Sequence, residues 1–170
     1  MHIEITLDAK PHAEAQSDSK TIYISKGRIA LLESEVEFAA LLAHELGHIK
    51  YGHYSIVPYA YTIVPGISSQ SFFWLSWRLG KFFRGLSPPQ TFEEYLYSIE
   101  TRQEIQADEF MAHSLPQHVH AAHVFADVLE RLMRLSGMLE TQHEPCTRMH
   151  RARIMRLREI EQEKNHAHPN

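Results

Sequence analysis

Cysteine is almost absent from this chain of 170 residues, which contains only Cys146. A single cysteine cannot form a disulfide within the chain, so nothing in the sequence requires an oxidising compartment. The first residues alternate between apolar and polar side chains, whereas a secretory signal needs a basic start and an uninterrupted apolar core. We therefore expect a cytoplasmic protein.

Positive charge is not in excess either, because 17 Lys and Arg residues face 21 Asp and Glu residues, for a net charge of −4. Such a chain has no overall basic field that would attract nucleic acid, which is not an expected partner. One local cluster is basic, but it contains no aromatic residues and glutamates follow it, so we interpret it as a solvated helix face. Its members are Arg148, Arg151, Arg153, Arg156 and Arg158.

Long apolar runs are also lacking. Residues 54–77 carry no formal charge, but Pro58, Pro65 and Gly66 divide them into pieces shorter than the about 20 apolar residues that a membrane-spanning helix needs. Residues 72–84 are rich in Phe and Trp, and three hypotheses fit them: core packing, a peripheral membrane contact through an amphipathic helix, or a lid beside the functional site.

Short runs of β-branched and aromatic residues at 3–7 and 21–25 predict two or three strands. Ser34 followed by Glu37 has the form of a capping box and predicts a helix over residues 35–50. A similar signal at residues 91–94 predicts a second long helix, from residue 92 to beyond Asp108 and ending before Pro116. Further helices are expected over residues 118–136 and from Pro145 into the polar segment 161–170.

These elements predict an α+β fold, in which a small antiparallel or mixed sheet near the N-terminus packs on the helix at residues 35–50 and the remainder is mainly helical. There is no internal repeat and no sign of a second domain. We expect a single domain over residues 1–160 and a polar C-terminal tail over residues 161–170.

The helix expected at residues 35–50 contains the sequence His-Glu-Leu-Gly-His, at residues 44–48. The spacing of four residues places His44 and His48 on one helix face, where both imidazoles can bind the same zinc ion. Glu45 is then placed to act as the general base toward a water molecule activated by the metal. Gly47 is costly inside a helix, which indicates that a neighbouring element packs closely there.

A catalytic zinc ion needs a third protein ligand, and the second long helix offers two carboxylates on one face, Glu104 and Asp108. Glu104 as ligand would complete the site, and Asp108 would accept a hydrogen bond from a ligand histidine and hold its ring. The small Ala107 between them would allow the two helices to approach closely. We therefore predict one zinc ion per chain.

These motifs resemble the HtpX-like and CAAX-prenyl-endopeptidase-type gluzincins, and in particular their compact members, the minigluzincins. The similarity covers roughly residues 1–54 and 91–160. The motifs that carry it lie at residues 22–29, at 35–48 with His53, and in the Glu-x-x-Ala-Asp element at residues 104–108. The resemblance implies a zinc endopeptidase in which His44, His48 and Glu104 bind the metal and Asp108 orients His44. It also implies that the strand at residues 21–25 is a sheet edge, where Ile22, Tyr23 and Ile24 bind an extended substrate by β-addition.

Two histidines are candidates for the donor that stabilises the oxyanion. The family has a His-Pro element before an Arg-Ile pair, and this chain has His143 two residues before Pro145, with Arg153-Ile154 further on. His143 is assigned the role of donor, and His150 is the competing candidate.

The sequence thus predicts a zinc-dependent endopeptidase acting on a peptide or protein substrate. The alternative is a non-catalytic or regulatory zinc module that acts on one dedicated protein partner. The presence of Glu45 favours catalysis, because a structural site needs no base and normally fills its fourth position with a protein ligand. The oligomeric state is left open.

Overall fold

The structure is a computed structural model that describes residues 1–16, 20–53, 92–138 and 144–167. The chain divides into two compact units, one formed by Met1–Tyr54 with Thr101–Asn170 and the other by Ser55–Glu100. The first unit contains the sheet, most of the helices and the candidate site. The segment 72–84, for which a membrane contact or a lid was considered, lies outside the described residues.

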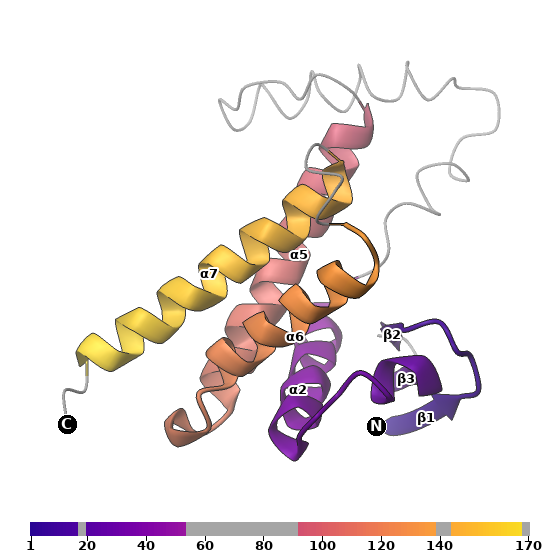
Figure 1. The fold of residues 1–170 in the computed structure, drawn as a ribbon, viewed down its shortest axis with the longest axis horizontal. Coiled ribbons are helices and arrows are strands. Elements are labelled where there is room, and N and C mark those ends of the chain that lie inside the picture. Colours follow the sequence, from indigo (N-terminus) through magenta and orange to yellow (C-terminus); the bar gives the residue numbers. More distant parts are fainter. Residues whose placement is uncertain (17–19, 54–91, 139–143, 168–170) are drawn as a thin grey trace. The chain divides into compact units, whose positions relative to one another are not determined.

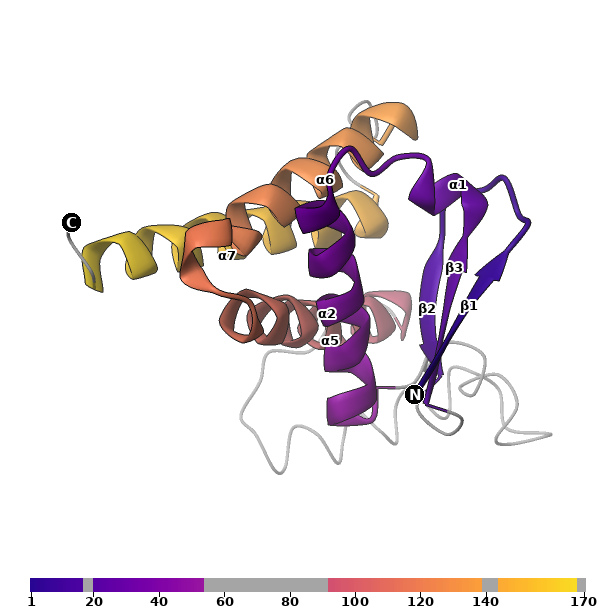
Figure 2. The ribbon, with the colours of Figure 1, turned by 90° about the horizontal axis from the view of Figure 1, so that it is seen from below.

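Three short strands form a mixed sheet in the order β1-β3-β2 (Figure 2). β1 (His2–Thr6) runs parallel to β3 (Thr21–Ser25), and β2 (Ala13–Gln16) pairs with the other side of β3 in antiparallel register. The prediction of a small mixed sheet is therefore confirmed, with the first strand one residue earlier than expected. β3 is the central strand, and its Ile22 and Ile24 are fully buried.

The prediction that residues 21–25 form a sheet edge is wrong. The backbone of Ile22, Tyr23 and Ile24 is paired with β1 on one side and with β2 on the other, so it offers no free hydrogen-bonding groups to a substrate strand. Among the described residues, the outer strands are β1 and β2.

α1 (Lys26–Ile29) follows β3 directly, and hydrogen bonds of Ser25 and Gly27 hold its start in place. The Ser25 hydroxyl caps it by accepting from the Arg28 backbone N–H at 3.0 Å, and it also accepts from the His12 N–H at 2.9 Å. The Gly27 N–H donates to the Asp8 carbonyl, and a Cβ at Gly27 would lie only 2.0 Å from the Ala9 carbonyl oxygen. α1 therefore has a defined position against the loop between β1 and β2.

α2 (Glu35–Tyr51) begins at the expected cap, where Ser34 accepts from the Glu37 N–H, and ends at Gly52 with the left-handed φ of 63°. The helix predicted at residues 35–50 is thus confirmed. α2 lies between the sheet and the other helices (Figure 2). The buried Glu37 near its start receives two hydrogen bonds from Arg131, at 2.8 and 3.2 Å, which tie α2 to α6.

The remaining helices are α5 (Phe92–Ser114), the short 3-10 helix η1 (Gln117–Val119), α6 (Ala121–Leu135) and α7 (Pro145–Ala167) (Figure 1). α5 ends before Pro116, as predicted. α6 begins three residues later than predicted, because His120 adopts a left-handed φ of 49° that separates η1 from α6. α7 continues across residue 160 to Ala167, so most of the polar segment is helical; the domain limits stay a prediction.

The core of the first unit joins β3, α2, α5, α6 and α7. Its largest fully buried apolar side chains come from the sheet and from all of the long helices: Ile22, Ile24, Leu41, Met111, Phe125, Leu129, Leu157 and Ile160. Within the described part of the chain, the helices are all too short or too polar to cross a membrane.

The close approach predicted at Gly47 is confirmed, since α5 passes directly over this residue. A Cβ added at Gly47 would lie 2.9 Å from Ala107 Cα and 3.2 Å from Ala107 Cβ. We expect Gly47→Ala to lower the melting temperature of the metal-free protein. The overpacking should lower the free energy of unfolding by about 1–3 kcal/mol, which outweighs the about 1 kcal/mol gained from the better helix propensity of alanine. Thermal unfolding followed by circular dichroism measures this.

The tightest contact, 2.9 Å, is with the backbone Cα of Ala107, so trimming the Ala107 side chain would not relieve it and the two helices would have to move apart. A Gly47→Ala protein more stable than the wild type would show that α2 and α5 separate at no cost.

Candidate metal centre

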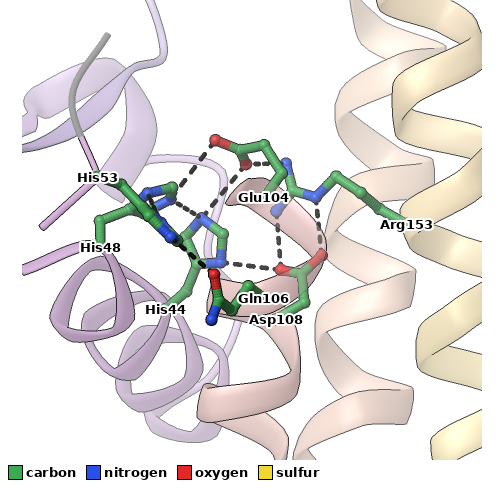
Figure 3. Close-up of polar contacts among 7 residues, drawn as sticks. All are labelled: His44, His48, His53, Glu104, Gln106, Asp108 and Arg153. Carbon is green, nitrogen blue, oxygen red and sulfur yellow. Dashed lines mark hydrogen bonds and ion pairs between the residues drawn. The ribbon is translucent and has the colours of Figure 1, made fainter. Parts of the chain in front are cut away.

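Three side chains from α2 and α5 converge in the first unit (Figure 3). The Nε2 atoms of His44 and His48, one helical turn apart, are 3.1 Å from each other. Glu104 lies 3.4 Å from both of them, through Oε2 to His44 and through Oε1 to His48. Ligand atoms of the three residues lie within 4.8 Å of one another, and in the described part of the chain no other group of this kind is found.

These distances fit a zinc ion. Zinc bonded to nitrogen and oxygen atoms at about 2.0–2.2 Å in a tetrahedron requires donor atoms about 3.3–3.5 Å apart. The distances of 3.1, 3.4 and 3.4 Å are close to these edges. Two imidazoles and one carboxylate also make up a donor set that catalytic zinc sites use, with the fourth position left to water or substrate.

Asp108 lies one turn after Glu104 and is completely buried. Its Oδ1 is 2.8 Å from His44 Nδ1, on the side of the ring opposite to Glu104. An imidazole that donates from Nδ1 to a carboxylate keeps the lone pair of Nε2 for a metal. Asp108 therefore occupies the position in which it holds His44 in the ligand tautomer.

Arg153 connects both carboxylates to α7. Its Nε and Nη2 donate to Asp108 at 2.8 and 2.9 Å, and its Nη1 is 2.6 Å from Glu104 Oε2. The interpretation of the arginine cluster as a solvated face is wrong for Arg153, which is only 4% exposed, although Arg151 on the same helix is exposed. The signal that could have identified an inward-facing arginine is the pair of carboxylates at Glu104 and Asp108, because two buried anions require a cation.

The charges around the site favour a bound cation. Burial lowers the pKa of His44, but Asp108 and Glu104 outweigh burial and raise the pKa of His44 to about 9. Burial, together with the charge of His44, lowers the pKa of His48 to about 4. Burial would raise the pKa of Glu104, yet Arg153 and His44 hold that pKa well below its usual range. The carboxylates thus stay ionised and attract a positive charge to the imidazoles, where a metal ion competes with the proton.

His53, which follows the end of α2, is a further residue of the site whose role the sequence reasoning missed. Its Nδ1 is 3.1 Å from His48 Nδ1, and its Nε2 is 3.0 Å from Gln106 Oε1 on α5 (Figure 3). With His48 Nε2 directed at Glu104, the His48 Nδ1–H donates to His53, and the His53 Nε2–H donates to Gln106. No local sequence pattern predicts these hydrogen bonds, because they form only when α5 lies beside the end of α2.

The other predicted site residues are placed as follows. Glu45 is 5% exposed and lies close enough to His44, Glu104 and Arg153 for their charges to act on it. His150 on α7 is buried, its Nδ1 has no partner among the described residues, and burial and Arg153 lower its pKa to about 4. His143 lies outside the described residues.

Comparison with protein families decides the class of this chain. The sequence model of peptidase family M48 matches residues 4–170, which is nearly the whole chain. The chain belongs to peptidase family M48. Comparisons with curated proteins and with solved structures found no match.

Family membership agrees with the HtpX-like resemblance and assigns this M48 chain to the zinc-dependent metallopeptidases, which are hydrolases. The substrate of such an enzyme is a peptide or a protein. The family match covers both α2, with its two histidines, and α5, with Glu104.

In this M48 chain we expect His53→Ala and Gln106→Ala each to weaken zinc binding by about 10- to 100-fold, because they loosen the orientation of His48. Competition with a chromogenic chelator measures the affinity. Gln103→Ala, on the same helix, is the control and should bind zinc as the wild type does. Unchanged affinity in both test variants would mean that His48 is oriented without His53.

Proposed function

We propose that this protein is a zinc-dependent endopeptidase in which His44, His48 and Glu104 bind the metal and Glu45 is the general base. The observation that carries the proposal is the distance of 3.4 Å or less between each pair of the three donor residues, with Glu45 next to His44 in the same helix. A structural zinc site needs no general base and normally fills its fourth position with a protein ligand.

When bound, zinc acts as a Lewis acid toward a water molecule and the carbonyl of the peptide bond. Glu45 takes the proton of the attacking water and later delivers it to the nitrogen of the leaving group. Burial raises the pKa of the Glu45 carboxyl, which brings it closer to the pH at which a group can both accept and release a proton.

The residues around the ligands set their geometry. Asp108 holds the His44 ring through Nδ1, and Arg153 keeps the Asp108 and Glu104 carboxylates ionised and fixed. His53 does for His48 what Asp108 does for His44. For the oxyanion, His150 is supported by its burial and its unpartnered Nδ1, while His143 rests on the sequence alone.

The substrate backbone requires a free sheet edge, which β3 does not offer. β2 is an outer strand among the described residues and contacts α2, the helix that carries the histidines. We place the extended substrate along β2, where it adds one strand to the sheet beside the metal centre.

The experiment that tests the proposed function compares three preparations of the wild-type protein on a broad peptide library. The zinc-loaded protein should cleave internal peptide bonds, a chelator should abolish cleavage, and zinc added back should restore it. Zinc-loaded protein that is folded but cleaves nothing would contradict the proposal and favour a regulatory zinc module with one dedicated partner.

A further inference from the structure

Two arginines are buried near the metal centre, and their surroundings differ sharply. Arg153 is 4% exposed and makes contacts of 2.6–2.9 Å with Glu104 and Asp108. Arg28 is 6% exposed, yet no ion pair is found for it in the described part of the chain, and its Nε has no hydrogen-bond partner there. Arg28 is thus a buried cation that lacks an anion of its own.

The position of Arg28 is fixed by the backbone. It lies in α1, which Ser25 caps and which Gly27 brings against the loop before β2. Its guanidinium lies close enough to Glu45, Glu104 and Arg153 for their charges to act on it. Arg28 therefore belongs to the surroundings of the general base and comes from the sheet side of the site, whereas Arg153 comes from α7.

The carboxylates near Arg28 have other partners or another role. Glu104 contacts both imidazoles and Arg153, and Glu45 has the role of proton acceptor. Burial and the repulsion of Arg153 lower the pKa of Arg28, and the attraction of Glu45 and Glu104 is too small to reverse this. The carboxylate partners of Arg153 raise the pKa of Arg153. A buried guanidinium without a close partner is unfavourable, and an incoming anion would relieve this.

We propose that Arg28 binds a carboxylate of the substrate close to the scissile peptide bond, so that the enzyme selects peptides with a negative charge at one defined position. This inference rests on the proposed function and names the substrate class of the same site. Carboxylate matches the planar, forked donor set of a guanidinium better than other common peptide groups do.

The carboxylate has two sources in a peptide, the side chain of Asp or Glu and the free C-terminus. The first makes the protein an endopeptidase with acidic specificity. The second restricts cleavage to bonds near the end of the chain. Both use the same chemistry at Arg28, and the choice of peptides separates them.

The experiment uses the zinc-loaded protein and a peptide that it cleaves. A single Glu or Gln is placed at each of the three positions on either side of the cleaved bond, and each peptide is made with a free and an amidated C-terminus. We expect kcat/KM for Glu to exceed that for Gln by about tenfold or more at one position, because the amide leaves Arg28 without an anion. If the C-terminus is the source, the free acid exceeds the amide by a similar factor instead.

Arg28→Met should reduce this ratio to about one, and Arg28→Lys should give an intermediate ratio, since lysine keeps the charge but loses the fork. The matched control is Arg151→Met, which removes an exposed arginine from α7 and should keep the wild-type ratio. A wild-type ratio of about one at every position and for both C-termini would overturn the proposal. So would the wild-type ratio in a folded Arg28→Met protein.

A binding measurement separates failure of this inference from failure of the proposed function. Fluorescein-labelled, alanine-based hexapeptides with one Glu or one Gln, as acid or amide, are titrated with the Glu45→Gln protein, and anisotropy gives the Kd. We expect one acidic peptide to bind about tenfold more tightly than its neutral counterpart, to lose this advantage when Arg28→Met is added, and to keep part of it when Arg28→Lys is added. If no peptide is ever cleaved, the proposed function fails, and equal binding of acidic and neutral peptides overturns the role of Arg28.

Discussion

Replacement of Glu45 by Gln is expected to lower kcat for peptide cleavage by about 100- to 10,000-fold, the usual contribution of a general base. Glutamine has nearly the same shape but cannot accept the proton of the attacking water. The zinc content should stay at one ion per chain, because the three donor residues are unchanged. The measurement pairs steady-state kinetics with elemental analysis of the same preparation.

Glu35→Gln is the matched control, since it makes the same change at an exposed position of α2 and should leave kcat unchanged. Cleavage by Glu45→Gln at a rate near that of the wild type would mean that another group is the base. Loss of zinc from Glu45→Gln would instead show that Glu45 helps to hold the metal.

His44→Ala, His48→Ala and Glu104→Ala are each expected to lose zinc during dialysis against a weak chelator that leaves the wild type loaded. Each removes one of three protein ligands, so the loss of affinity should exceed the about 10- to 100-fold change that follows from loss of a residue outside the ligand set. Elemental analysis after dialysis measures the zinc per chain.

Asp108→Ala is expected to fall between these variants and the wild type, because it frees the His44 ring but removes no ligand. Glu109→Ala, at a partly exposed carboxylate of α5 that pairs with Arg156, is the control and should keep its zinc. Full zinc occupancy in Glu104→Ala, with the affinity of the wild type, would show that the third ligand is another residue.

The parts of this fold that the sequence predicts well are those set by neighbours along the chain. The cap at Ser34, the left-handed Gly52 and the four-residue spacing of His44 and His48 are local, and α2 follows from them. Gly47 and Ala107 also indicate where two helices meet, because glycine is costly inside a helix and the small side chain of Ala107 leaves room for a close approach.

The parts that the sequence predicts poorly depend on contacts between distant segments. The composition of β3 fits an edge strand and a central strand equally well. Only its pairing with both β1 and β2 shows that it is central. Arg153 lies in a run of arginines whose members look equivalent, and it turns inward because the carboxylates of Glu104 and Asp108, more than 40 residues earlier, face it from α5. His120 interrupts a helical pattern through one left-handed residue, which periodicity does not reveal.

The hydrogen bond between His53 and Gln106, at 3.0 Å, joins two points of the chain that are 53 residues apart. In polymer terms it closes a loop, and a zinc ion shared by His48 and Glu104 closes almost the same loop. The entropy lost on closing a loop of this length, which grows only with the logarithm of the number of residues, is incurred once and not twice. The hydrogen bond and the metal should therefore form cooperatively, and residues that never touch zinc contribute to its affinity by bringing the two ends of the loop together.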